Sequence, residues 1–244
     1  MMTKDFFAGI VAENYDADCA RDFAPGALVP IVDNLAILAK GGTCLEFAIG
    51  TGRVALPLAA RGLIVDGIEY APDMVGKLRN KPGGADLHVL IGDMAKTQMG
   101  KTYDLVFLVF NTIMNLTTQA AQVACFKNAA HHLKTGGKFI VEVMVPELRS
   151  FPPGATAVPF DITPSHMGFD TYQLSTQQLV SHHVYIAADG TARYDSLPFR
   201  YVWPSELDLM AELAGMKLLS RHADWIGSVF VDESQRHVSV WEKQ

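Results

Sequence analysis

The chain has 244 residues, of which 49% are hydrophobic and 19% charged, and its formal net charge is −6. This length suits one large domain or a core domain that carries an insertion, and the composition excludes disordered, collagen-like and disulfide-scaffold classes. The mild acidity argues against a nucleic-acid groove, which needs a concentrated Lys and Arg face.

The N-terminal sixteen residues contain three acidic residues and no long apolar stretch, so we expect neither a signal peptide nor a membrane anchor. The three cysteines, Cys19, Cys44 and Cys125, are odd in number and lack the spacing of zinc ligands. They are typical of buried thiols in a reducing compartment. We therefore expect a cytoplasmic protein without a metal site and without a membrane partner.

Short apolar runs alternate with amphipathic stretches between residues 43 and 145. The runs at 43–48, 64–69, 87–91, 105–110 and 139–145 are predicted strands buried on both faces. Helices are predicted at 53–61, where Pro57 should kink the helix or delay its start, and at 72–80. A third helix follows the fourth strand, with Thr117 as its cap and Gly136-Gly137 as its end. This alternation predicts a parallel, doubly wound α/β sheet.

The pattern changes after residue 145, where six helix-breaking Pro and Gly positions occur within twenty residues. Alternating stretches at 178–187 and 191–202, divided by Asp189-Gly190, predict a β-hairpin. A helix should begin at Pro204, with Leu207, Met210, Leu213 and Ala214 on one face and Gly215 as its stop, followed by strands at 217–222 and 237–242. We predict N-terminal helices and a cofactor-binding α/β core in 1–145, an inserted substrate-covering β segment in 146–203, and completion of the core by 204–244.

The segment LEFAIGTGR places Gly50 and Gly52 between the first strand and the following helix. Glycine lets the backbone approach a ligand closely, and a helix N-terminus offers free N–H donors. Glu69, at the end of the second strand, suits the two hydroxyls of a ribose. Asp93 and Met94, after the third strand, suit an adenine amine and the adenine ring. All of these lie at carboxyl ends of strands, where open α/β sheets bind ligands.

Two cofactors compete for this arrangement. The spacing Gly50-x-Gly52-x-x-Ala55 satisfies the dinucleotide fingerprint, so an NAD(P)-dependent oxidoreductase is one alternative. Glu46, inside the first strand, would repel a pyrophosphate but can receive an ammonium group, and Arg53 can counter a carboxylate. These charges favour S-adenosylmethionine. A non-catalytic protein that binds this cofactor is the other alternative, because a fold does not fix a function.

The chain resembles the class I S-adenosylmethionine-dependent methyltransferases over essentially its whole length. The resemblance rests on ExxxGTG from Glu46, GIEYAPDM at 67–74, IGDM at 91–94, FNTIMNL after the fourth strand, and HLKTGGKFIVEV at 132–143. It is similar to the small-molecule branch, which includes amino-sugar N-methyltransferases and glycine N-methyltransferase-like enzymes. The resemblance implies a Rossmann-like seven-stranded sheet with an antiparallel last strand. It also implies in-line methyl transfer to nitrogen or oxygen of a small-molecule acceptor.

The resemblance assigns most of the predicted cofactor site. Tyr15 matches a tyrosine that contacts the methionine carboxylate, and Asn111 lies where the family places a residue beside the sulfonium. Ala48 replaces the first glycine of the family's GxGxG motif, a change that we expect to be tolerated. With Arg53 added from the charge argument, the predicted set is Tyr15, Glu46, Ala48, Gly50, Gly52, Arg53, Glu69, Tyr70, Met74, Asp93, Met94 and Asn111.

The inserted segment is expected to cover the methyl acceptor. His166 and His182 are the predicted catalytic residues, although His182 and His183 should point to opposite faces of a strand, so at most one faces the acceptor. Asn115, Tyr172 and Arg200 are the predicted acceptor-binding residues, with a surface salt bridge as the alternative for Arg200. Asn115 stands where some sugar N-methyltransferases carry a catalytic His or Tyr, and Asn is no base at neutral pH. The choice of base, the N or O nucleophile and a homodimeric assembly are therefore left open.

Overall fold

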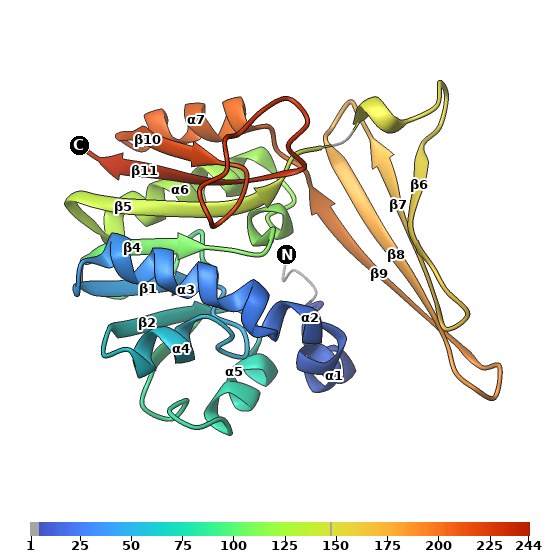
Figure 1. The fold of residues 1–244 in the computed structure, drawn as a ribbon, viewed down its shortest axis with the longest axis horizontal. Coiled ribbons are helices and arrows are strands. Elements are labelled where there is room, and N and C mark those ends of the chain that lie inside the picture. Colours follow the sequence, from blue (N-terminus) through green and yellow to red (C-terminus); the bar gives the residue numbers. More distant parts are fainter. Residues whose placement is uncertain (1–4, 147) are drawn as a thin grey trace.

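The computed structural model describes residues 5–146 and 148–244. Its main sheet has seven strands in the order β10-β11-β5-β4-β1-β2-β3 (Figure 1). The strands are β1 (Thr43–Phe47), β2 (Ile64–Glu69), β3 (His88–Ile91), β4 (Tyr103–Leu108), β5 (Leu133–Met144), β10 (Met216–His222) and β11 (Arg236–Lys243). Among these strands, β11 runs antiparallel to both of its neighbours, β10 and β5, and all the other pairs are parallel. The predicted doubly wound sheet with an antiparallel last strand is confirmed.

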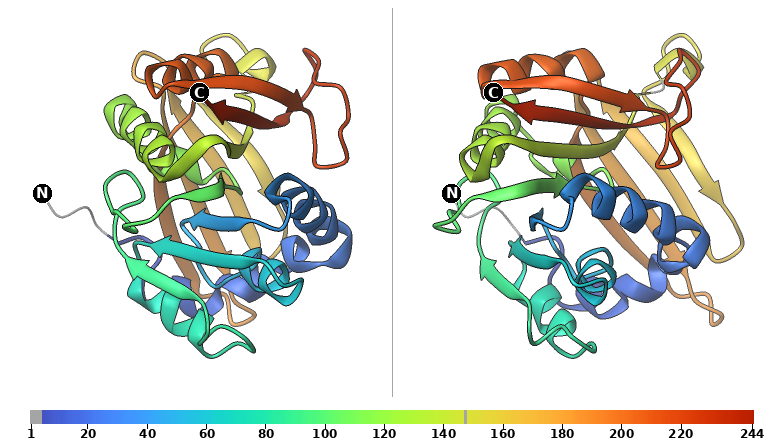
Figure 2. Two further views of the ribbon diagram at one scale, coloured as in Figure 1. Left: turned by 90° about the vertical axis from the view of Figure 1, so that its left-hand side faces the viewer. Right: turned by 60° about the vertical axis from the view of Figure 1, so that its left-hand side comes forward.

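Helices cover both faces of the main sheet because its central strands are apolar on both sides. One buried cluster joins Phe126 of α6 (Gln119–His132) and Leu207 of α7 (Pro204–Leu213) to the sheet. The other joins Leu35 of α3 (Pro25–Ala39) and Leu58 of α4 (Ala55–Ala60) to the opposite face, together with Leu78 of α5 (Pro72–Arg79). Figure 2 shows these two helical layers from the side. The layers leave the carboxyl ends of the strands accessible.

The ends of α6 differ from the prediction. Its N-cap is Thr118 and not Thr117, since the Thr118 hydroxyl accepts a hydrogen bond from the Ala121 N–H at 3.2 Å. The helix ends at His132, and Gly136 and Gly137 lie inside β5. The reason is that the chain enters β5 at once to pair with β4, where the register is irregular.

The start of α4 and the buried face of α7 can be compared with their predictions. The helix α4 starts at Ala55, so the prediction that Pro57 delays its start is confirmed. In α7, Leu207, Met210 and Ala211 are buried but Leu213 is 65% exposed, so its placement on the buried face was wrong. Leu213 lies in the last turn, where the helix has no layer to pack against.

A second sheet, antiparallel and four-stranded, lies beside the carboxyl ends of the main sheet (Figure 1). Its strands in order are β6 (Ala157–Ile162), β7 (His166–Gln173), β8 (Gln178–Ile186) and β9 (Ala192–Arg200). The hairpin predicted at Asp189-Gly190 joins β8 to β9. The edge strand β6 was not predicted, because Pro159 interrupts its pattern. This proline sits at a register shift on the sheet edge, a position that needs no ladder hydrogen bond.

Two short helices, α1 (Ile10–Asp18) and α2 (Ala20–Phe23), lie on one side of the molecule between the main sheet and the second sheet (Figure 1). Asp16 ties α1 to the core, because it accepts a hydrogen bond from Thr51 at 2.5 Å and pairs with Lys81 at 2.6 Å. A 3-10 turn, η1 (Thr112–Asn115), follows β4, and η2 (Leu148–Ser150) follows β5. Over residues 5–146 and 148–244, no helix combines the length and apolar character needed to cross a bilayer.

Candidate functional site

The turn after β1 has a backbone that only glycine adopts easily. Gly50 has φ 57° and Gly52 has φ 82°, both in the left-handed region. A Cβ on Gly52 would also run into the Leu78 side chain. Glu69 holds this turn in place, since one of its oxygens accepts the Gly50 N–H at 2.8 Å and the other the Ala71 N–H at 2.9 Å. The turn is therefore a rigid cradle at the carboxyl ends of β1 and β2.

Ala48, the departure from the family's glycine motif, takes φ 52°. The left-handed region costs a residue with a Cβ about 1–2 kcal/mol. The turn thus keeps the backbone shape of a glycine motif at a cost in free energy.

Glu46 is a buried carboxylate that lacks a full set of partners. Its side chain is 3% exposed, and within the described residues its Oε2 atom has no hydrogen-bond partner. Burial raises the pKa of Glu46 well above its usual value, whereas the Arg53 guanidinium acts to lower it. An unpaired buried carboxylate oxygen is costly unless a donor reaches it. The ammonium group of an amino-acid ligand would supply that donor, so this residue fits S-adenosylmethionine.

Tyr15 and Arg53 lie on the same side of the glycine turn. Burial raises the pKa of Tyr15. Its ring packs against the buried cluster that includes Met74, the side chain next to Gly50, so α1 lies close to the turn. The Arg53 guanidinium donates to the Asp22 carbonyl at 3.2 Å and lies 4.8 Å from the centre of the Phe110 ring. These contacts bring together groups that suit the carboxylate end of an amino-acid ligand.

The remaining predicted cofactor residues follow β2 and β3. Tyr70 is 44% exposed beside Glu69, whereas Met74 is buried next to Gly50. One Asp93 oxygen accepts the Ala95 N–H at 2.8 Å, and Met94 packs into the main core. The structure therefore brings these residues to one edge of the sheet, and their individual roles toward the cofactor stay predictions.

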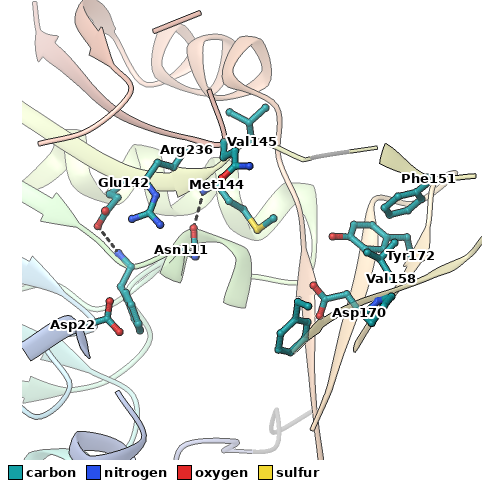
Figure 3. Close-up of a pocket in the computed structure, with 14 residues that line it drawn as sticks. Asp22, Asn111, Glu142, Met144, Val145, Phe151, Val158, Asp170, Tyr172 and Arg236 are labelled. Carbon is teal, nitrogen blue, oxygen red and sulfur yellow. Dashed lines mark hydrogen bonds between the residues drawn. The ribbon is translucent and has the colours of Figure 1, made fainter. Parts of the chain in front are cut away.

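A cavity of about 450 Å³ lies where the carboxyl ends of β4 and β5 face β6 and β7 (Figure 3). Its lining combines aromatic rings with charged groups from segments far apart in the sequence. The charged side chains in the lining are the carboxylates Asp22, Glu142 and Asp170 and the guanidinium Arg236. At neutral pH the lining thus carries more negative than positive charge.

A strained turn fixes one wall of the cavity. Phe110 and Asn111 both adopt left-handed backbone angles, with φ 63° and 60°. The Phe110 N–H donates to the Glu142 carboxylate at 3.2 Å, and the Asn111 side-chain oxygen accepts the Met144 N–H at 2.7 Å (Figure 3). Such strain is characteristic of functional sites. Asn111, predicted beside the sulfonium, does line the cavity, and Glu142 lies beside it.

The opposite wall comes from β7. Asp170 and Tyr172, two residues apart, face the cavity together (Figure 3). The Asp170 Oδ1 atom is buried and has no hydrogen-bond partner within the described part of the chain. Burial raises the pKa of Asp170, while the facing Ser181 acts to lower it. The Tyr172 ring lies 4.8 Å from that of Phe151, so the predicted acceptor-binding tyrosine is part of an aromatic wall.

The structure does not bring His182 to the cavity, which corrects its prediction as a catalytic residue. Its ring stacks on Phe169 at 4.6 Å and hydrogen bonds to Thr171, on the face of the sheet turned away from Asp170. His183 instead shares the face of Asp170. The prediction that the two histidines point apart is confirmed, but the sequence could not say which one faces inward.

Arg200 is also not in the lining of the cavity. It is 5% exposed, pairs with Glu206 at 2.7 Å and donates to the Gln122 side chain at 2.5 Å. This buried ion pair fastens β9 to α6 and α7, which corrects the predicted role in acceptor binding. Asn115 ends η1 and is likewise outside the lining. His166, the other predicted catalytic residue, is also outside it, because it lies at the start of β7 and lines a second pocket with Tyr185.

Sequence reasoning missed the three carboxylates of the cavity. Glu142 did carry a signal, since an acidic residue inside the apolar run 139–145 needs a reason to be there. Asp22 and Asp170 carried none, because their neighbours in the sequence are ordinary surface and strand residues.

Comparisons with known proteins agree with this geometry. The sequence profile of a methyltransferase domain matches residues 44–137. The chain is similar to the CcbJ methyltransferase from Streptomyces caelestis, with 34% identity, 88% of each chain covered and a TM-score of 0.80. It is also similar to the cypemycin N-terminal methyltransferase of a Streptomyces species, with 24% identity over 209 residues and 84% of each chain covered. A third relative, the dTDP-3-amino-3,6-dideoxy-alpha-D-glucopyranose N,N-dimethyltransferase of Streptomyces fradiae, is 33% identical over 119 residues, which are 48% of this chain and 45% of that protein.

Solved structures with this fold hold bound S-adenosylmethionine. The orphaned Glu46 oxygen and the glycine cradle fit the same cofactor, which supplies a methyl group activated by a sulfonium. Because an identity of 34% extends over 88% of both chains, the protein belongs to the S-adenosylmethionine-dependent methyltransferases.

Proposed function

We propose that the chain is an N-methyltransferase whose acceptor is a small-molecule amine held in the cavity between β4, β5, β6 and β7. The observation that carries this proposal is the charge of the lining, which has three carboxylates and one guanidinium. Such a lining attracts a protonated amine more strongly than a neutral alcohol. Two relatives named above methylate nitrogen according to their names, which supports the same choice.

Methyl transfer from a sulfonium is a displacement in which the acceptor nitrogen, the methyl carbon and the sulfur lie in one line. No covalent enzyme intermediate is required, so the protein contributes mainly by positioning and by excluding water. We infer that Glu46, Arg53 and Tyr15 hold the amino-acid end of the cofactor, and that Glu69 and Asp93 hold its nucleoside end. These contacts would direct the sulfonium toward Asn111 at the cavity.

Glu142 is the group that we assign to orienting the amine. It is buried, and one of its oxygens is fixed by the Phe110 N–H. A charge-assisted hydrogen bond from an ammonium group to such a carboxylate contributes about 1.5–3 kcal/mol. Arg236, at the rim of the cavity, gives a position for an anionic group of the acceptor. The acceptor class is then an amine that also carries a negative or strongly polar substituent.

The test is a panel of matched acceptors with quantification of S-adenosylhomocysteine. The panel contains an amino-hexose 1-phosphate, a dipeptide with a free N-terminus and a cyclic secondary amino acid, each beside the analogue with hydroxyl in place of the amine. We expect turnover with at least one amine and none with its hydroxyl analogue, and a loss of turnover in Glu142→Gln. Turnover with the hydroxyl analogues alone would show O-methylation and overturn the proposal.

Calorimetry separates the remaining alternatives. We expect S-adenosylmethionine and S-adenosylhomocysteine to bind, and binding to weaken in Glu69→Ala. Binding of NAD in their place would favour an oxidoreductase. Cofactor binding without turnover on any acceptor of a widened panel would favour the non-catalytic alternative.

A further inference from the structure

A row of polar side chains runs along the inner face of the second sheet, away from the cavity. It begins at Asp170, continues through Ser181 and His183 on β8, and ends at His166 and Asp161. The strand register places Ser181 opposite Asp170 and His183 opposite Gly168. Because residues two apart in a strand share a face, the row lies on the same side of the sheet as the cavity.

The members of the row are joined by hydrogen bonds. Ser181 Oγ lies 3.2 Å from His183 Nε2, and His183 Nδ1 lies 3.0 Å from His166 Nε2. His166 Nδ1 in turn lies 2.6 Å from an Asp161 carboxylate oxygen. At the inner end, Ser181 lies against Asp170, whose Oδ1 atom is buried and unpartnered within the described residues. The outer end reaches water, since the Asp161 side chain is 41% exposed.

Aromatic packing holds the two imidazoles in this row. The His166 ring stacks on the His183 ring at 5.2 Å and on the Tyr185 ring at 4.7 Å. Phe160, which also lines the cavity, packs on His183 at 5.4 Å. Only glycine fits at position 168, because a Cβ there would run into the Phe160 ring. The packing therefore holds the two imidazoles in line, although Phe160 is itself 50% exposed and His166 also lines a second pocket beside Tyr185.

The carboxylate at the outer end sets the direction of the hydrogen bonds. Asp161 can only accept, so His166 must donate from Nδ1, and a neutral His166 must then accept at Nε2. His183 consequently donates from Nδ1 and accepts at Nε2 from Ser181. When the Ser181 hydroxyl turns from Asp170 to His183, every donor points from the cavity toward Asp161, which is the order that proton transfer to the solvent requires.

We propose that this row is a proton relay that removes the proton of the ammonium acceptor before methyl transfer. The inference rests on the proposed function, because it concerns how that amine becomes a nucleophile. Asp170 is the residue that would contact the acceptor, and Ser181, His183, His166 and Asp161 act through it.

Each transfer in the relay is balanced. The N–H bond of the ammonium breaks, its electron pair stays on nitrogen, and the proton binds an Asp170 oxygen. Asp170 then gives that proton to Ser181 Oγ, and Ser181 gives its own hydroxyl proton to His183 Nε2. His183 releases its Nδ1 proton to His166 Nε2, and His166 releases its Nδ1 proton to Asp161, which passes it to water. The nitrogen lone pair is then free to attack.

The charged surroundings keep the central imidazole ready to accept a proton. Burial and the neighbouring His166 lower the pKa of His183, and His182 behind it acts in the same direction. Asp195 on β9 and Asp18 on α1 oppose this shift, and Tyr185 and Arg193 flank the outer end. His183 is therefore neutral at neutral pH. The described residues include no group of three His, Cys, Asp or Glu side chains placed to hold a metal ion.

The chain offers a matched pair of variants for the test, since His182 and His183 are adjacent and face opposite sides of β8. The turnover number is measured from pH 6 to pH 9.5 for wild type, His183→Phe and His182→Phe, with the panel amine that gives the highest turnover. General acid–base groups contribute about 10²–10⁴-fold, so we expect His183→Phe to lose at least about tenfold at pH 7. The loss should vanish as pH approaches the pKa of the free amine. His182→Phe should keep the wild-type profile.

Two further measurements exclude a merely structural effect. We expect imidazole in the buffer to restore turnover of His183→Ala at pH 7, and Asp161→Asn to shift the profile without changing the KM for S-adenosylmethionine. An equal loss in the His182 and His183 variants, or a loss in His183→Phe that is the same at every pH, would overturn the relay.

Nitrogen NMR of the histidine rings tests the relay independently of turnover, because it shows which ring nitrogen carries the proton. We expect both His166 and His183 to carry their proton on Nδ1 at pH 7, and Asp161→Asn to change the His183 signals through His166. An Nε2-protonated His183 that is insensitive to Asp161 would overturn the relay. If no amine of the panel is methylated, the proposed function fails while this measurement still judges the row.

Discussion

The two halves of the site are built by different means. The cofactor half is shaped by backbone, because Gly50, Gly52 and Ala48 adopt left-handed angles and Glu69 binds main-chain N–H groups. The acceptor half is shaped by side chains that converge from α2, β5, β7 and β11. A backbone cradle tolerates few residue types, whereas a side-chain wall can change one residue at a time. The comparison teaches that the cofactor half depends on one short stretch of backbone, whereas the acceptor half collects side chains from elements spread along the whole sequence.

The largest expected effect is a loss of stability on breaking the Arg200–Glu206 pair, which fastens the second sheet to α6 and α7. Arg200→Met removes the buried member of the pair together with its bonds to Gln122 and Glu206, and breaking a buried pair costs about 3–5 kcal/mol. Urea unfolding measures the loss of stability. The exposed pair Arg61–Asp33 serves as the control, since Arg61→Met should cost less than about 1 kcal/mol. Similar losses in both variants would show that the second sheet is not fastened through Arg200.

The next effect concerns the cradle of the cofactor half. Gly52→Ala combines a left-handed backbone with a clash against Leu78, for a cost of about 2–4 kcal/mol. Gly62→Ala has φ 86° but no atom near the added Cβ, so it should cost only the backbone strain. Thermal unfolding and S-adenosylhomocysteine titration check both variants. We expect cofactor affinity to fall in Gly52→Ala and to stay unchanged in Gly62→Ala.

Glu46→Gln should separate binding from stability. Losing a charge-assisted contact to the cofactor costs about 1.5–3 kcal/mol, which calorimetry would record as at least a tenfold weaker affinity. The pKa of Glu46 is raised in the folded state, so wild-type stability falls as pH rises above about 4.5, the ordinary glutamate value. The variant, which cannot ionise, should lose this fall and become the more stable protein at pH 7. Weaker binding together with lower stability would contradict the assignment.

The smallest expected effect is on the unfolding free energy, when Ala48 in the turn of the cofactor half is replaced by glycine. Ala48→Gly removes the backbone strain of a non-glycine residue at φ 52° but adds freedom to the unfolded chain. We expect a net gain of at most about 1 kcal/mol in unfolding free energy, with an unchanged affinity for S-adenosylhomocysteine. A loss of affinity would mean that the alanine methyl group contacts the cofactor.

The parts of the fold and of the site that were predicted correctly follow from short sequence patterns. The seven-stranded sheet followed from apolar runs at regular spacing, and the cradle followed from Gly50 and Gly52 beside Glu46. The acceptor half depends on strand register, and β8 carries polar residues on both faces, so the alternation could not choose between His182 and His183. Gly136 was misread as a helix stop because glycine also serves an irregular strand register, which only the pairing partner reveals.

The buried Arg200–Glu206 pair lies at one end of the second sheet, and the turn at Asp189-Gly190 lies at the other (Figure 1). The second sheet is therefore fixed to α6 and α7 at one end, and its other end extends beyond the core. A small rotation of the sheet about its fixed end would displace the β8–β9 turn much more than Tyr172, which lies near the fixed end. Substitutions in the β8–β9 turn should therefore alter the movement of the second sheet while leaving the surroundings of Tyr172 nearly unchanged.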